Sequence, residues 1–146
     1  MAIQFLLALN RQGKLRISKW YANIPESQKR QLIRKVHKLI SSRDHQKQSN
    51  FVQFENQKLI YRRYNGLYFI ICCDLASKDN ELSYLEVIHL LVEILDVYFD
   101  NVCELDLIFN FYKIYEVLDE LILAGELQET SKDLILNRLH YLDALS

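Results

Sequence analysis

A chain of 146 residues, half of them hydrophobic, can bury one substantial core and is too apolar for a disordered segment. One proline and three glycines leave no stretch with the composition of a linker, so one domain over residues 1–146 is expected. No apolar run reaches the roughly 18 residues of a membrane-spanning helix, and the first residues lack the basic start of a secretory signal. Three cysteines, an odd number without a secretory context, are expected as reduced thiols in the cytosol.

The net charge of −1 conceals two parts of opposite sign. Residues 1–50 hold 11 Lys and Arg against 2 Asp and Glu, whereas residues 79–146 hold 3 against 15. Two solvated faces would explain this distribution, and so would a basic face that meets an anionic partner, lipid included. Nucleic acid is not favoured as that partner, because the basic part lacks aromatic residues interleaved with arginine in any familiar binding motif.

The first fifty residues predict a hairpin followed by a helix. Residues 3–9 are apolar nearly throughout, as in a strand that is covered on both faces. A turn at residues 10–13, with Gly13, leads into residues 14–21, where apolar and polar side chains alternate as in a second strand. Pro25 suits the first turn of a helix that ends near Ser42 and is apolar on one side only.

Three strands and a long helix follow. A strand beginning at Phe51, a turn at Asn56 and Gln57, and strands at residues 58–64 and 67–75 are expected, the last two joined by an Asn-Gly hairpin turn. Residues 81–100 predict a helix that is apolar around much of its circumference. We expect a partner to cover part of it, although a fully internal helix is the alternative. The residues assigned to the partner face are Val87, Leu90, Leu91, Ile94 and Val97.

The last third predicts helices only. A junction at residues 101–113 leads into a helix that we expect to end at Gly125. Thr130 and Asp133 are spaced as in a capping box before a last helix. Five strands interrupted by one helix and followed by helices indicate an α+β fold, with a mostly antiparallel sheet and helices packed on its faces.

Residue patterns for catalysis are absent from the sequence. The four histidines have no ligand spacing to one another or to cysteine, so neither a metal nor a cofactor is expected. Cys72 and Cys73 are adjacent in a strand and point to opposite faces, as small buried residues do. Glu104 and Asp106 lie two apart, which places them on different faces of a helix and makes them poor acid–base partners. The chain is not expected to be an enzyme.

Four segments together resemble the small (sigma) subunits of clathrin adaptor complexes, in order and in spacing, over essentially the whole chain. They are Arg11-Gln12-Gly13-Lys14-Leu15-Arg16 with Lys19-Trp20-Tyr21, the run of residues 60–69, the junction at residues 101–113, and residues 124–131. Within the family, Arg62-Arg63-Tyr64, Asn50-Phe51-Val52 and Phe111-Tyr112-Lys113 look most like the endocytic complex, adaptor protein complex 2.

The resemblance implies a longin-like fold, a five-stranded antiparallel sheet with helices on both sides and extra C-terminal helices. It also implies a heterotetramer in which the small chain contacts an alpha-type large subunit directly, beside a beta-type large and a medium (mu) subunit. Such a complex recruits clathrin and sorts the cytoplasmic tails of transmembrane cargo in coated pits, as a peripheral assembly on the cytoplasmic face of the plasma membrane. A free-standing longin-type regulator of vesicle trafficking is the alternative.

The resemblance also implies a site for cargo tails with an acidic residue, three spacers and a Leu-Leu or Leu-Ile pair. By that likeness Arg16 supplies positive charge near the acidic residue. One departure matters, because the endocytic family usually has alanine where this chain has Asn65, so a leucine pocket there is narrower or wetter unless the side chain points away. The expected leucine-pocket residues are Leu67, Val92, Val102 and Leu107, and the expected rim residues are Tyr64, Asn65 and Asn101.

Overall fold

The computed structural model describes residues 3–43, 50–74, 81–123, 126–127 and 132–145. The expected order of strands and helices is confirmed, with one extra short helix, Glu104–Phe109, in the expected junction and two short extra strands near the C-terminus. The elements are β1 (Ile3–Asn10), β2 (Leu15–Trp20), α1 (Glu26–Ser41), β3 (Phe51–Phe54), β4 (Gln57–Tyr64), β5 (Leu67–Asp74), α2 (Glu81–Phe99), α3 (Glu104–Phe109), α4 (Phe111–Leu121), β6 (Ile122–Leu123), β7 (Glu126–Leu127) and α5 (Lys132–Leu145).

The sheet separates two hydrophobic cores. Its five antiparallel strands lie in the order β2-β1-β5-β4-β3, so β1 and β5 occupy the middle. Alternate side chains of β1 therefore enter opposite cores, with Leu6 on one side and Leu7 on the other. This double coverage explains why the strand is apolar nearly throughout, and it confirms the α+β prediction.

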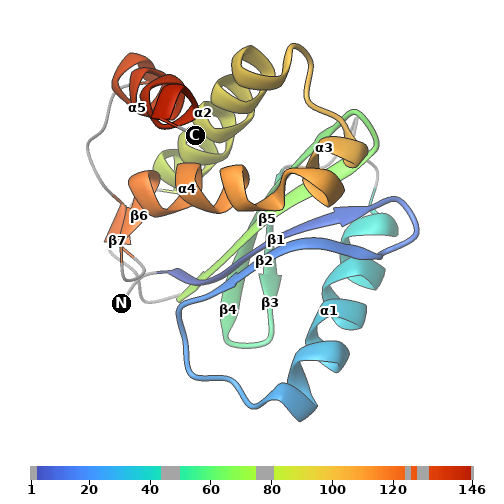
Figure 1. Cartoon of the computed structure of the whole chain (residues 1–146). Helices are drawn as coiled ribbons and strands as arrows, with labels where there is room; N and C mark the ends of the chain where they lie inside the picture. The colour runs from blue at the N-terminus through green and yellow to red at the C-terminus, as the bar shows by residue number, and fades with distance from the viewer. Residues whose placement is uncertain (1–2, 44–49, 75–80, 124–125, 128–131, 146) are drawn as a thin grey trace.

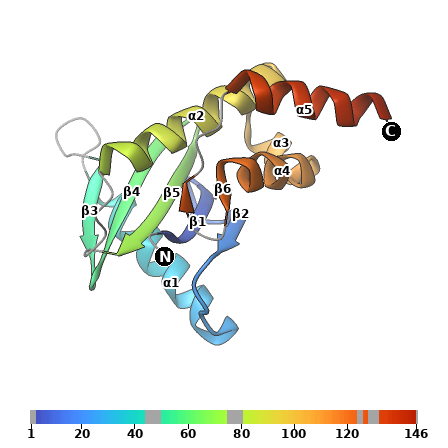
Figure 2. The same cartoon turned by 90° about the vertical axis from the view of Figure 1, so that its left-hand side faces the viewer.

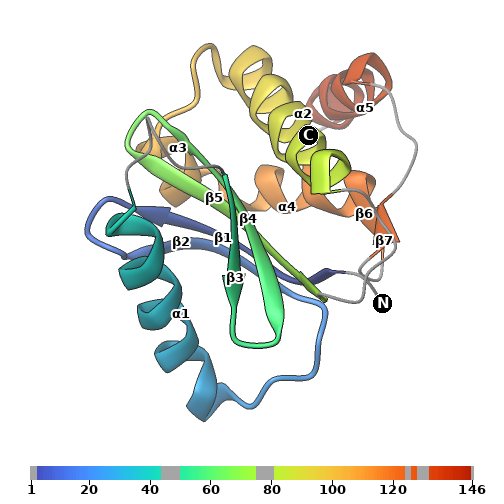
Figure 3. The same ribbon diagram turned by 180° about the vertical axis from the view of Figure 1, so that it is seen from behind.

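The helices divide unequally between the two faces of the sheet. Helix α1 packs alone on one face, where Val36 and Ile40 are buried, while α2, α4 and α5 cover the other (Figures 1 and 2). Seen from behind, α1 again lies apart from the other helices (Figure 3). The apolar stripe of α1 meets the sheet, and its outer side carries polar and charged residues.

Three predicted boundaries differ from the structure. Pro25 is the N-cap residue of α1, with an extended backbone at φ −60° and ψ 141°, and does not lie in the first turn of the helix. The β3–β4 turn lies at Glu55 and Asn56, because Gln57 already pairs with Phe54. Helix α4 ends at Leu121, since residues 122–123 pair with residues 126–127 as strands. Gly125 and Thr130, the expected helix end and cap, lie outside the described residues.

Helix α2 is mostly internal. The sheet covers one side of it and α4 and α5 pack on another, which accounts for its wide apolar surface. Leu91 and Ile94, assigned to a partner face, are 1% and 0% exposed within the chain's own core, so the prediction is wrong for these two. Val87 and Leu90 are partly buried, and Val97 is 54% exposed.

The packing of the β1–β2 turn against α1 can be tested by substitution. Gly13 has φ +86°, and a Cβ atom there would lie 2.7 Å from the His37 ring of α1, whereas a Cβ at Gly66 (φ +76°) would meet nothing closer than 3.5 Å. We therefore expect Gly66→Ala to cost about 1–2 kcal/mol in the free energy of unfolding, from backbone conformation alone. Gly13→Ala should cost clearly more in urea denaturation, and equal losses would contradict the docking of the turn on α1.

Candidate functional site

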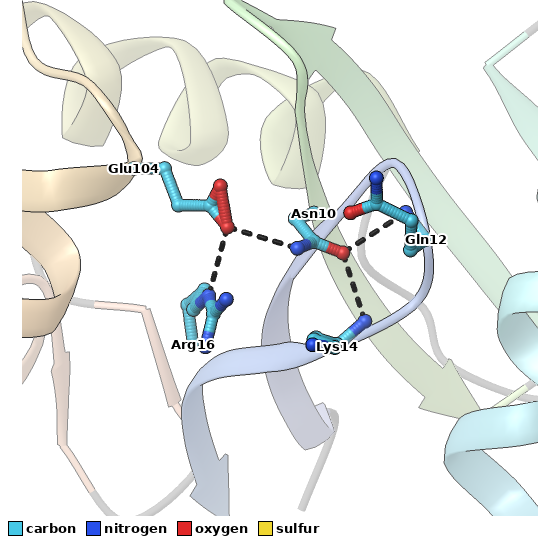
Figure 4. A network of polar contacts seen from close by, with 5 residues as sticks. All are labelled: Asn10, Gln12, Lys14, Arg16 and Glu104. Atoms are coloured by element: carbon cyan, nitrogen blue, oxygen red, sulfur yellow. Dashed lines mark hydrogen bonds and ion pairs between the residues drawn. The ribbon is translucent and has the colours of Figure 1, made fainter.

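A carboxylate joins the β1–β2 hairpin to α3. Glu104 Oε1 accepts hydrogen bonds from Arg16 Nε and from Asn10 Nδ2, each at 2.9 Å (Figure 4). The amide oxygen of Asn10 in turn accepts from the backbone N–H groups of Gln12 and Lys14, also at 2.9 Å each. Asn10, only 4% exposed, therefore holds the turn in shape and fixes Glu104 at the same time.

The charge of Arg16 is compensated inside the chain. The hydrogen bonds from Asn10 and then Arg16 lower the pKa of Glu104 below its usual value of 4.5, so this carboxylate is ionised at neutral pH. The Arg16 and Glu104 side chains are 24% and 35% exposed, so the pair stands in contact with solvent. Arg16, expected by the family resemblance to supply positive charge, is thus one half of an ion pair that is neutral as a whole.

Two of the rim residues, Tyr64 and Asn101, bond to Asp96. Tyr64 donates its hydroxyl hydrogen to Asp96 Oδ2, and this bond raises the pKa of Tyr64. The carboxylate oxygen Oδ1 of Asp96 accepts a hydrogen bond from the backbone N–H of Val102 at 2.9 Å. The backbone carbonyl oxygen of Asp96 accepts one from the N–H of Asn101 at 3.0 Å. Asp96 therefore ties the β4–β5 hairpin to the link between α2 and α3.

Asn65 points toward the site. Its backbone lies at φ 46°, as the hairpin turn requires, and its Nδ2 atom donates to the carbonyl oxygen of Val102 at 3.4 Å. The side chain thus lies across the rim instead of pointing away, which was the alternative raised by the sequence. This long hydrogen bond is a weak one.

The four residues expected to line the leucine pockets lie in one core and are buried there. Leu67, Val102 and Leu107 are 0% exposed and Val92 is 4% exposed. Side chains of the same chain fill the space around them, so these residues are brought together without an opening to solvent. The sequence identified their shared location and could not show that they would be covered.

A hollow lies beside the covered residues. Its volume is about 270 Å³, slightly below the usual range for ligand pockets. Its walls include Arg16 and Leu107, and Tyr115 is held there by two bonds of its hydroxyl to the backbone of Ser18, at 2.9 and 3.2 Å. The remaining lining residues are Leu15, Ile108 and Phe111.

Sequence reasoning missed several residues of this region. Asn10, Asp96 and four walls of the hollow were not assigned, although a polar residue at the end of an apolar strand and a carboxylate near the end of an apolar helix were visible signals. The four walls are Leu15, Ile108, Phe111 and Tyr115. Glu104 was considered only as a poor acid–base partner of Asp106, and no partner elsewhere in the chain was expected for it. Asp106, noted with it, accepts from the backbone N–H of Cys103 at 3.0 Å and so caps α3.

Neither a metal centre nor a membrane span is found among the residues that the structure describes. No group of three or more His, Cys, Asp or Glu side chains in that part of the chain is placed to hold a metal ion. None of its helices combines the length and the apolar character needed to cross a bilayer.

Comparison with known proteins gives a consistent result. The family model described as clathrin adaptor complex small chain matches residues 2–146. The AP-2 complex subunit sigma of Gibberella zeae is 56% identical over 143 residues, covering 98% of this chain and 99% of the relative. That of Saccharomyces cerevisiae is 53% identical over 148 residues, covering 99% of each. A chain of a homology model of the full-length AP-3 complex in a stretched open conformation matches with a TM-score of 0.75 and 30% identity, covering 98% of this chain and 94% of that one.

The lowered pKa of Glu104 predicts a pH-dependent contribution to stability. A depressed pKa in the folded state means that the contribution is present above the unfolded value near 4.5 and is lost as the pH falls through the folded value. Because the pair is accessible to solvent, we expect Glu104→Gln to lower the free energy of unfolding by about 1 kcal/mol or less at neutral pH. Urea denaturation across the acid range should show this difference shrinking below pH 4.5. A difference that grows on acidification would contradict the assignment.

Proposed function

The chain belongs to the clathrin adaptor complex small chain family, and on that premise we propose that it reads acidic dileucine sorting signals of transmembrane cargo for clathrin-mediated endocytosis. Members of this family are subunits of adaptor complexes and are not enzymes. The observation that carries the proposal is the convergence of Arg16, the rim residues and the buried aliphatic residues at one end of the sheet. A basic group beside a cluster of aliphatic side chains suits a peptide with an acid and two leucines.

The two leucines would supply most of the affinity. Two fully buried leucine side chains contribute about 3–6 kcal/mol before the costs of association, which suits a reversible signal reader with micromolar affinity. Since Leu67, Val92, Val102 and Leu107 are covered, leucine binding requires side chains to move apart. The hollow already borders Leu107, one of the covered residues, so we expect the side chains to move apart there first.

The acidic residue of the cargo signal would contribute less to the affinity than the two leucines. Arg16 Nε is bonded to Glu104, so a cargo carboxylate meets a guanidinium whose charge is already balanced. The exposed Lys14 ammonium, close enough to act on Glu104, adds positive charge beside it. An accessible pair of this kind adds modestly to affinity and is screened by salt.

Direct contact with an alpha-type large subunit accounts for the apolar side chains that the chain leaves exposed. They gather on α3, the start of α4 and α5, so the proposed partner face shifts there from α2, retaining Val97 and the partly buried Val87 and Leu90. Through this contact the chain would join beta-type and mu subunits, clathrin and cargo tails at plasma-membrane coated pits. The exposed residues on these helices are Leu105, Ile108, Phe109, Phe111, Tyr112, Leu134, Tyr141, Leu142 and Leu145.

The test is peptide binding to the chain co-expressed with its alpha-type subunit, measured by calorimetry. An acidic dileucine peptide should bind in the micromolar range, and replacing both leucines by serine should abolish binding. Ile108→Glu, on the wall of the hollow, should weaken binding about tenfold or more, because a charge would then occupy an apolar entrance. Gln31→Glu, an exposed residue on the other face of the sheet, is the charge-matched control and should change nothing.

Two outcomes would overturn the proposal in different ways. Co-purification without peptide binding would leave a scaffold subunit with no leucine site. Failure to co-purify, with the chain monomeric and soluble by itself, would favour a free-standing longin-type regulator.

A further inference from the structure

A row of three cations follows the outer side of α1. Arg30, Arg34 and Lys38 are spaced by four residues, so they lie on one side of the helix along about 12 Å of its axis. All three side chains are exposed. None of them makes an ion pair with another residue in the described part of the chain.

The other charges of this helix are compensated. Glu26, its only acidic residue, pairs with Lys29 at 2.9 Å, and Lys35 lies 3.5 Å from Glu55 on the β3–β4 turn. The row of three is therefore not neutralised from within the helix. The row supplies three of the 11 Lys and Arg residues that make residues 1–50 basic.

The β1–β2 turn packs against the C-terminal half of α1 without adding a cation to the row. The ring nitrogen Nε2 of His37 lies 2.9 Å from the carbonyl oxygen of Arg11, and Gly13 packs against the same ring. Only the backbone of Arg11 lies beside α1, because the Nε atom of its exposed side chain lies 3.5 Å from the position of a Cβ atom added at Gly66, in the β4–β5 turn. In both front and rear views the turn lies next to this end of the helix (Figures 1 and 3). We name Arg30, Arg34 and Lys38 the α1 basic surface.

We propose that the α1 basic surface binds the anionic headgroups of a lipid bilayer. Long cationic side chains that stand apart from one another suit a plane of mobile negative charges, because each can find a headgroup independently. Ser27, Gln31 and Ser41, which are exposed on the same helix, provide no apolar wedge. Binding would therefore be adsorption at the headgroup level and sensitive to salt.

An acidic peptide is the less favoured occupant. The surface is the convex side of a helix, where a peptide finds no groove. One hollow that borders α1 is lined by Glu55 and Asp74 against Lys35 alone, so an acidic peptide laid in it would meet net like charge. A second is lined by Lys35, Lys38 and Glu55 and reaches only the last cation of the row. The proposal does not rest on the leucine site, which lies against the opposite face of the sheet.

The test compares two triple variants of the full chain in vesicle sedimentation. The probes are phosphatidylcholine vesicles with and without about 30 mol% phosphatidylserine, at about 0.1 M salt. The row variant combines Arg30→Gln, Arg34→Gln and Lys38→Gln. The control variant removes the same number of positive charges through Lys29→Gln, Lys35→Gln and Arg138→Gln. These three cations are paired with Glu26, Glu55 and Glu120. Circular dichroism checks that both variants keep their helix content.

We expect the natural chain to bind the anionic vesicles and not the neutral ones. The row variant should lose about tenfold or more in its partition coefficient, and the matched control about twofold or less. Equal losses in the two variants would show that net charge alone acts, and no preference for anionic vesicles would also overturn the proposal. Binding of a glutamate-rich peptide by the natural chain, without vesicle binding, would replace the bilayer by an acidic protein partner.

Discussion

The carboxylate of Glu104 is the contact on which the functional end of this molecule depends. Through Asn10 and Arg16 it joins the first hairpin to a helix that follows 94 residues later in the sequence. Helix α3 has only six residues and cannot persist without such tertiary contacts. The position of α3 determines where Leu107 lies and how far the hollow beside Leu107 extends. It also determines how closely Glu104 approaches Arg16. One buried asparagine and one ion pair thus govern both the shape and the electrostatics of the proposed cargo site.

The β1–β2 turn places two surfaces of different chemistry side by side. On one side Asn10 reaches α3 and the aliphatic cluster, and on the other Arg11 and Gly13 lie against His37 of α1. In our account cargo is read on the first side and lipid headgroups are met on the second. A cargo tail emerges from a membrane, so a lipid-binding surface next to the peptide site would bring the reader close to its signal.

The sequence allowed the sheet, its hairpins and the helix order to be predicted, because the strands β1 and β5 are apolar on both faces and Asn65-Gly66 marks a tight turn. The rim and pocket residues were also placed together, by resemblance to the family. The exposure of individual side chains could not be predicted, since Leu91 and Ile94 look like any other apolar residue until α4 and α5 are packed on α2. Likewise, the pairing of Arg16 with Glu104 depends on two segments far apart in the chain, which no local pattern reveals.

The most direct measurement is the affinity of two peptides, one with an acidic residue before the leucine pair and one with glutamine there, for the natural complex and for Glu104→Gln. If Glu104 competes for Arg16, its removal should strengthen binding of the acidic peptide about threefold to fivefold and leave the glutamine peptide nearly unchanged. An identical preference for the acid in both proteins would contradict this account of the site. Absence of binding by either peptide would remove the cargo-reading function itself.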